Sequence, residues 1–82
     1  MRVTVRLFAR LRDIVGGAAE LAREVPPGAT IGLVWQQLVG EFPELARYEQ
    51  SMSSAVNADY ARMDQPVRDG DEVAFLPPVS GG

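Results

Sequence analysis

The sequence predicts an α+β domain in which one amphipathic helix covers one face of a β-sheet. Residues 2–8 alternate polar and apolar side chains, which is the pattern of a half-buried strand. Residues 31–42 repeat their apolar side chains at helical spacing. Residues 72–76 alternate again and end at two prolines, which cannot donate to a sheet ladder. An 82-residue chain with 46% hydrophobic residues suffices for one such domain with a single core.

The first strand is expected to bury three alternating side chains: Val3, Val5 and Leu7. Residues 9–15 are then expected to form a short helical turn or loop. Gly16 and Gly17 end this turn, since adjacent glycines break regular structure.

A second strand is predicted over residues 18–25, with an inner set of Ala19, Leu21 and Val25. Its alternation is imperfect because Arg23 falls in the same set. The main helix follows, with Thr30 as its N-cap and Pro43 at its end. Two glycines inside it, Gly32 and Gly40, each lower helix stability by up to ~1 kcal/mol relative to alanine.

The second half of the chain predicts three more strands, after a possible short helical turn within 44–52. Residues 54–56 and 60–62 are expected to pair as a hairpin around a connection at 57–59. The last strand, 72–76, places Val73 and Phe75 on one face and Ala74 and Leu76 on the other. The predicted order is β-β-α-β-β-β.

The composition excludes several kinds of site. The chain has no histidine and no cysteine, which removes the usual ligands of zinc, iron–sulfur and haem centres. It also removes Ser-His-Asp and Cys-His nucleophiles. The net charge of −3 argues against a nucleic-acid partner.

The sequence favours a cytoplasmic protein. No apolar run approaches the ~18–20 residues of a membrane span. Residues 1–6 alternate, so they are predicted to be a strand rather than a signal peptide. Without cysteine there is no disulfide framework to indicate secretion.

The reactive group is predicted to be the carboxylate of the chain's own last residue, Gly82. Residues 77–82 can extend about 20 Å at ~3.3–3.6 Å per residue. Pro77 and Pro78 favour stiff polyproline geometry, and Gly81 and Gly82 fit a tunnel too narrow for side chains. An ionised carboxylate can attack the α-phosphate of ATP, and a sulfur donor can displace AMP to leave a thiocarboxylate. Two glycines alone also fit a frayed chain end.

Three segments carry a resemblance to a known family: residues 6–16, residues 55–60 and, most specifically, residues 69–82. They are similar to the small subunits of molybdopterin synthases, within the ubiquitin-like sulfur-carrier family. The resemblance implies a β-grasp fold, with a mixed sheet on one main helix and a flexible Gly-Gly tail. It assigns residues 1–76 to the domain and residues 77–82 to the reactive tail.

The same resemblance implies a reaction cycle. An ATP-dependent, ubiquitin-activating-like adenylyltransferase adenylates Gly82, and a sulfurtransferase system converts it to 1-thioglycine. The tail, with Gly81 beside the reactive end, then enters the large subunit of the synthase in a heterotetramer. There it delivers sulfur to precursor Z. The chain itself needs no catalytic side chain and no tightly bound cofactor.

A docking face is expected on the open side of the sheet. Phe8 and Leu76 point to that side, and Tyr60 can join them. The resemblance implies that both partners use this face, and that Pro77, Pro78, Val79 and Ser80 also contact them. Arg10 and Arg12 are expected to rim the face and meet acidic partner residues. Scattered surface hydrophobes and a solvated charged turn are the alternatives.

Other functions stay open at this point. The chain can carry sulfur for thiamin, cysteine or tRNA thiolation. It can also be a protein modifier that joins Gly82 to lysines, or a binding module whose tail is idle.

Overall fold

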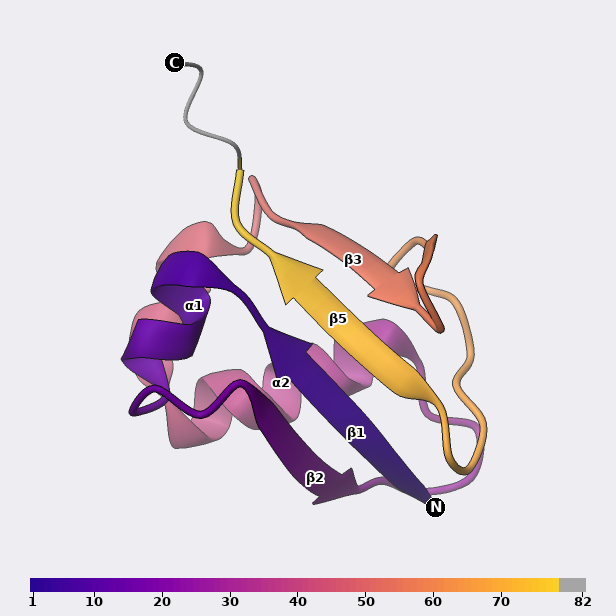
Figure 1. The fold of residues 1–82 in the computed structure, drawn as a ribbon. Helices are drawn as coiled ribbons and strands as arrows, with labels where there is room; N and C mark the ends of the chain where they lie inside the picture. Colours follow the sequence, from indigo (N-terminus) through magenta and orange to yellow (C-terminus); the bar gives the residue numbers. More distant parts are fainter. Residues whose placement is uncertain (79–82) are drawn as a thin grey trace.

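The computed structural model describes residues 1–78, which fold into a mixed sheet with helices on one side (Figure 1). The elements are, in chain order, β1 (Arg2–Leu7), α1 (Ala9–Ile14), β2 (Glu20–Glu24), α2 (Ile31–Glu41), the 3-10 helix η1 (Pro43–Tyr48), β3 (Ser53–Val56), β4 (Asp59–Tyr60) and β5 (Glu72–Leu76). The strands lie in the order β2-β1-β5-β3-β4. Only the β1–β5 pair is parallel within the described chain. The predicted α+β class and element order are confirmed.

The core lies between the sheet and α2. Strands β1 and β5 send their alternate side chains toward the helix, and these are almost fully buried: Val3, Val5, Leu7, Val73 and Phe75. Trp35 of α2 packs on Phe75 with ring centroids 5.0 Å apart. The buried indole N–H donates to Glu49 Oε1 at 2.9 Å, so it is not left without a partner. The predicted inward faces of both strands are therefore confirmed.

Strand β2 is shorter than expected, and Ala19 lies before it, exposed rather than inward. Arg23 is the residue that disturbed the alternation. Its Nε and Nη2 atoms donate to the two carboxylate oxygens of Glu41 at 2.8 and 2.7 Å. A bidentate pair lets a half-buried arginine sit on the inner side of an edge strand. The irregular pattern thus marks a contact between β2 and the end of α2.

The hairpin after β3 is tighter than the sequence suggested. Asn57 and Ala58 alone form its turn, with φ values of 49° and 72°. Positive φ at both central residues is typical of a type I′ turn, which matches the twist of paired strands. The expected strand at 60–62 is wrong in its bounds, because β4 ends at Tyr60 and the chain then leaves the sheet.

The departing segment covers the start of α2. The N–H groups of Ile31 and Gly32 donate to the carbonyls of Gln65 and Met63 at 3.0 and 2.8 Å. Thr30 is the N-cap, as predicted, and its hydroxyl accepts a further hydrogen bond from the first turn. These bonds satisfy donors that a helix leaves free at its N-terminus. A Cβ on Gly32 would lie 3.2 Å from the Met63 carbonyl oxygen, so a close crossing accounts for this glycine.

Within residues 1–78, no helix combines the length and the apolar character that crossing a membrane requires.

Candidate functional site

The tail begins at the end of a central strand. Because β1 and β5 are parallel, the end of β5 lies beside the end of β1, with Phe75 opposite Leu7. β5 ends at Leu76, where the domain was expected to end; Pro77 is half-buried and Pro78 is exposed. The remaining predicted tail residues lie outside the described chain: Val79, Ser80, Gly81 and Gly82.

A shallow hollow of about 250 Å³ lies on the open face of the sheet, opposite α2. We call it the sheet hollow; its lining residues are Arg6, Phe8, Ala55, Ala58, Tyr60, Glu72, Ala74 and Leu76. The three predicted docking residues, Phe8, Tyr60 and Leu76, are thus brought together from three strand ends. Two of them stay open to solvent, Phe8 at 37% and Tyr60 at 80%.

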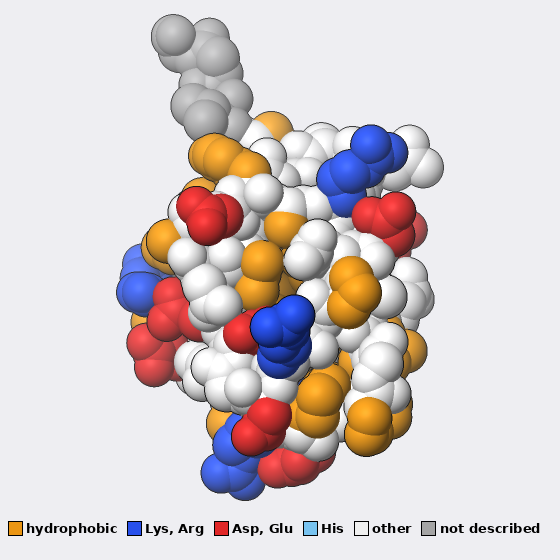
Figure 2. All heavy atoms as spheres, turned by 90° about the vertical axis from the view of Figure 1, so that its right-hand side faces the viewer, with side chains coloured by type: hydrophobic (Ala, Val, Ile, Leu, Met, Phe, Trp, Pro, Cys, Tyr) orange, Lys and Arg blue, Asp and Glu red, His pale blue; other side chains and the backbone are white. Residues whose placement is uncertain are grey.

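Cross-strand pairing explains why a hollow forms there. Ala55 of β3 lies opposite Ala74 of β5 and opposite Tyr60 of β4. Side chains on directly paired residues project to the same face of a sheet. Small alanines in the middle, with larger apolar side chains around them, leave a depression lined largely by carbon. Figure 2, seen from the β3–β4 side, shows hydrophobic side chains interspersed with charges of both signs.

Arg6 is a lining residue that the sequence analysis did not single out. Its guanidinium carbon lies 5.6 Å from the Phe8 ring centroid, in cation–π range. Its Nε and Nη1 atoms are 3.8 and 3.7 Å from Glu20 and Glu72 carboxylate oxygens, which makes both ion pairs long and weak. The buried Nε has no hydrogen-bond partner among the described residues. The alternation that placed Phe8 on the open face also places Arg6 there. The sequence pattern was therefore enough to predict Arg6 as a residue of this face.

The two arginines of α1 do not rim the sheet hollow. Ala9 has a positive φ of 52°, so the chain turns sharply between β1 and α1. Within α1, Leu11 is fully buried, and Arg10 and Arg12 project on different sides of the helix. The basic residue at the sheet hollow is therefore Arg6. A partner contact for the exposed Arg12 stays a prediction.

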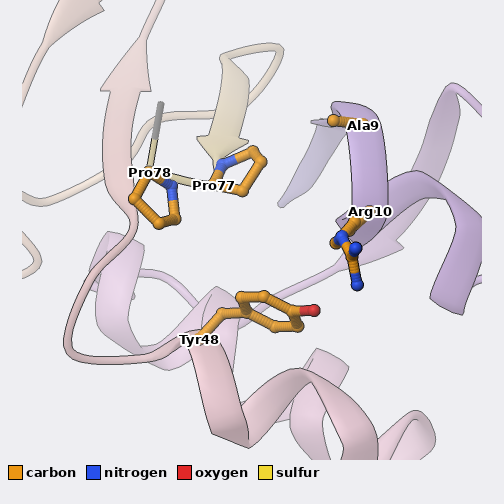
Figure 3. A pocket seen from close by; sticks show the side chains of 5 residues that line it. All are labelled: Ala9, Arg10, Tyr48, Pro77 and Pro78. Atoms are coloured by element: carbon orange, nitrogen blue, oxygen red, sulfur yellow. The ribbon is translucent and has the colours of Figure 1, made fainter. Parts of the chain in front are cut away.

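Arg10 instead lines a second hollow, of about 370 Å³, where the tail leaves the domain (Figure 3). We call it the tail-root hollow; its other lining residues are Ala9, Tyr48, Pro77 and Pro78. α1 and η1 supply one side of it, and the residues after β5 supply the other. Both prolines were predicted to bind partners, whereas Tyr48 was not among the predicted residues.

The described residues thus form two hollows near the end of β5. Among residues 1–78, no group of three or more carboxylate side chains is placed to hold a metal ion. One surface is apolar and lies on the sheet; the other pairs a basic side chain with prolines at the start of the tail.

Comparison with known proteins gives matches along nearly the whole chain. A sequence profile of the ThiS family matches residues 5–82. The molybdopterin synthase sulfur carrier subunit of Escherichia coli strain K12 is 37% identical, over 98% of this chain and 99% of its own length. The protein of the same name from Arabidopsis thaliana is 34% identical, over 100% of this chain and 84% of its own.

Among solved structures, SAMP1 from Haloferax volcanii superposes with a TM-score of 0.88 at 30% identity, covering 100% of both chains. This likeness confirms the expected ubiquitin-like β-grasp fold.

Proposed function

Since the chain belongs to the ThiS family, we propose that it is the sulfur carrier subunit of a molybdopterin synthase. The observation that carries the proposal is its identity of 34–37%, over 98–100% of this chain, to relatives of that name from a plant and a bacterium. The resemblance expected from three segments of the sequence is confirmed by these matches.

The proposed chemistry takes place on the carboxylate of Gly82. A carboxylate oxygen attacks the α-phosphate of ATP held by an activating adenylyltransferase, and pyrophosphate leaves. A sulfurtransferase system then supplies the sulfur that replaces AMP, which leaves Gly82 as a thiocarboxylate. All catalytic side chains come from the partners, which fits a chain without histidine or cysteine.

Delivery requires a second partner. The thiocarboxylate enters the large subunit of the synthase, where its sulfur displaces an oxygen leaving group from a carbon of precursor Z. Water then cleaves the acyl–sulfur bond, so the sulfur stays on the precursor and Gly82 returns as a carboxylate. Two rounds complete the dithiolene of molybdopterin. In this scheme each partner binds the sheet hollow through the apolar side chains that line it. Pro77 and Pro78 stiffen the start of the tail. We place the cycle in the cytoplasm, where ATP is available.

Intact-mass analysis tests the proposal. The full chain, incubated with ATP, the activating enzyme and a sulfur source, is expected to gain about 16 Da as one oxygen is replaced by sulfur. Deletion of Gly82 moves the carboxylate back by ~3.3–3.6 Å, so it no longer reaches the α-phosphate. The deletion is expected to abolish the mass gain and sulfur transfer while leaving the thermal unfolding midpoint unchanged. Sulfur transfer by the shortened chain would refute the proposal.

One observation favours a second function. The matched SAMP1 is named a small archaeal modifier protein, and its similarity extends over the whole chain. A modifier would join Gly82 to lysines of other proteins. Mass spectrometry of cell lysate separates the two functions. Gly-Gly remnants on target lysines indicate conjugation, whereas a free chain about 16 Da heavier indicates sulfur carriage.

A further inference from the structure

We propose that the tail-root hollow binds a side-chain carboxylate of the protein that takes up the tail. This inference rests on the proposed function and names the partner chemistry at that site. It concerns a surface separate from the sheet hollow, because the two hollows share no lining residue.

The hollow presents two hydrogen-bond donors toward one space. Figure 3 shows the Arg10 guanidinium and the Tyr48 hydroxyl on one side, with Pro77 and Pro78 across from them. Within residues 1–78, Arg10 has no carboxylate within ion-pairing distance, as is also true of Arg12, Arg47, Arg62 and Arg68, whereas Arg2 and Arg23 each have one and Arg6 has two. Of the unpaired arginines, Arg10 is the one that lines a hollow together with the prolines after β5. A guanidinium offers a planar fork that fits the two oxygens of a carboxylate. The proline and alanine walls would shield such a pair from water and so strengthen it.

The surroundings of the hollow are less acidic than the chain as a whole, which carries a net charge of −3. An adjoining recess shares Arg10 and Tyr48 with the hollow and adds Arg47, against Asp13 and Glu44. Two arginines there balance two carboxylates, so no excess of negative charge opposes an anion at Arg10.

The position of the hollow selects a protein carboxylate over a nucleotide phosphate. Pro77 and Pro78 form one wall, so the hollow adjoins the point where the described chain ends and the tail begins. A phosphate that reacts with the terminus sits at Gly82, four residues beyond Pro78. An extended chain covers about 13 Å over that interval. The anion at Arg10 therefore belongs to the rim of the partner's tail-binding channel.

A charge-reversal pair tests the inference. Arg10→Glu and the matched control Arg68→Glu change the net charge equally, and Arg68 is exposed at the opposite end of the domain, before β5. Affinity for the purified large subunit and for the activating enzyme is measured without nucleotide. Arg10→Glu is expected to weaken binding to at least one of them by about tenfold or more. The substitution replaces the attraction between Arg10 and the partner's carboxylate by repulsion between two carboxylates. Arg68→Glu is expected to stay within about twofold.

Two further variants define the chemistry. Tyr48→Phe keeps the ring and removes one donor, so a smaller loss of affinity is expected. Replacing an acidic residue at the mouth of the partner's channel by arginine is expected to restore binding to Arg10→Glu but not to the unchanged chain. Circular dichroism and thermal unfolding confirm that each variant is folded.

Three outcomes would overturn the inference: equal losses for Arg10→Glu and Arg68→Glu, a loss that occurs only when ATP is present, or no partner charge that rescues Arg10→Glu. Failure of the proposed function is a different result. In that case the unchanged chain binds neither partner and gains no sulfur.

Discussion

Replacing Phe8 by alanine should weaken partner docking by an amount that follows from its exposure. Phe8 is 37% exposed in the free chain, which is about 75 Å² of a side chain of roughly 200 Å². If a partner covers this area, its burial contributes about 1.9 kcal/mol at ~25 cal/mol per Å². The expected loss of affinity is therefore about twentyfold. The free chain loses the Arg6–Phe8 cation–π contact, about 0.5–1 kcal/mol, and in addition the packing of the part of the ring that is already covered, so thermal unfolding is measured for the variant as well.

Leu33→Ala is the matched control, because Leu33 has the same 37% exposure but lies on α2, behind the sheet. Dissociation constants for the large synthase subunit are measured by calorimetry for both variants and for the unchanged chain. Phe8→Ala should lose about twentyfold, and Leu33→Ala should stay within about twofold. Equal losses, or none for Phe8→Ala, would show that the sheet hollow is not the docking face.

Four further predictions concern stability and are checked by thermal unfolding. Gly40→Ala should raise the unfolding free energy by about 0.5–1 kcal/mol, a midpoint shift of ~4–8 °C per kcal/mol, because nothing lies within 4 Å of the new Cβ. Gly32→Ala should gain less or be destabilising, since its Cβ meets the Met63 carbonyl at 3.2 Å; a gain as large as that of Gly40→Ala would contradict this reading. Thr30→Ala should cost about 1 kcal/mol through the lost N-cap, and no change would mean that the cap contributes nothing. Phe75→Ala should cost about 3–5 kcal/mol, because it empties a fully buried site against Trp35; a smaller loss would mean that the core closes around the cavity.

Strand faces were predicted well, because a period of two needs only local information. Val5 and Phe75 point to the core, and Phe8 and Leu76 point outward, as alternation required. The helix and its Thr30 cap were predicted for the same reason, since both signals lie within a few residues.

The irregular parts were harder to predict. No local sequence pattern predicts that backbone carbonyls within residues 63–65 accept hydrogen bonds from the first turn of α2, about thirty residues earlier in the chain. That crossing ends β4 early and occupies the space a side chain at position 32 would need. The imperfect alternation at Arg23 was visible, but its partner, Glu41, was identified only when β2 and α2 were packed together.

The proposed chemistry at Gly82 was predicted from the sequence alone. A chain without histidine or cysteine lacks the side chains that usually act as nucleophiles, and this holds whatever the fold. The docking surfaces were decided by tertiary structure. Arg10 and Arg12 are two residues apart, yet burial of Leu11 between them turns them to different sides, and only the packing of α1 on η1 brings Arg10 to Tyr48 and the tail prolines. Sequence spacing determines which side chains share a face of one helix or strand. Contacts between elements depend on the orientation in which each element packs on the core, which the spacing does not determine.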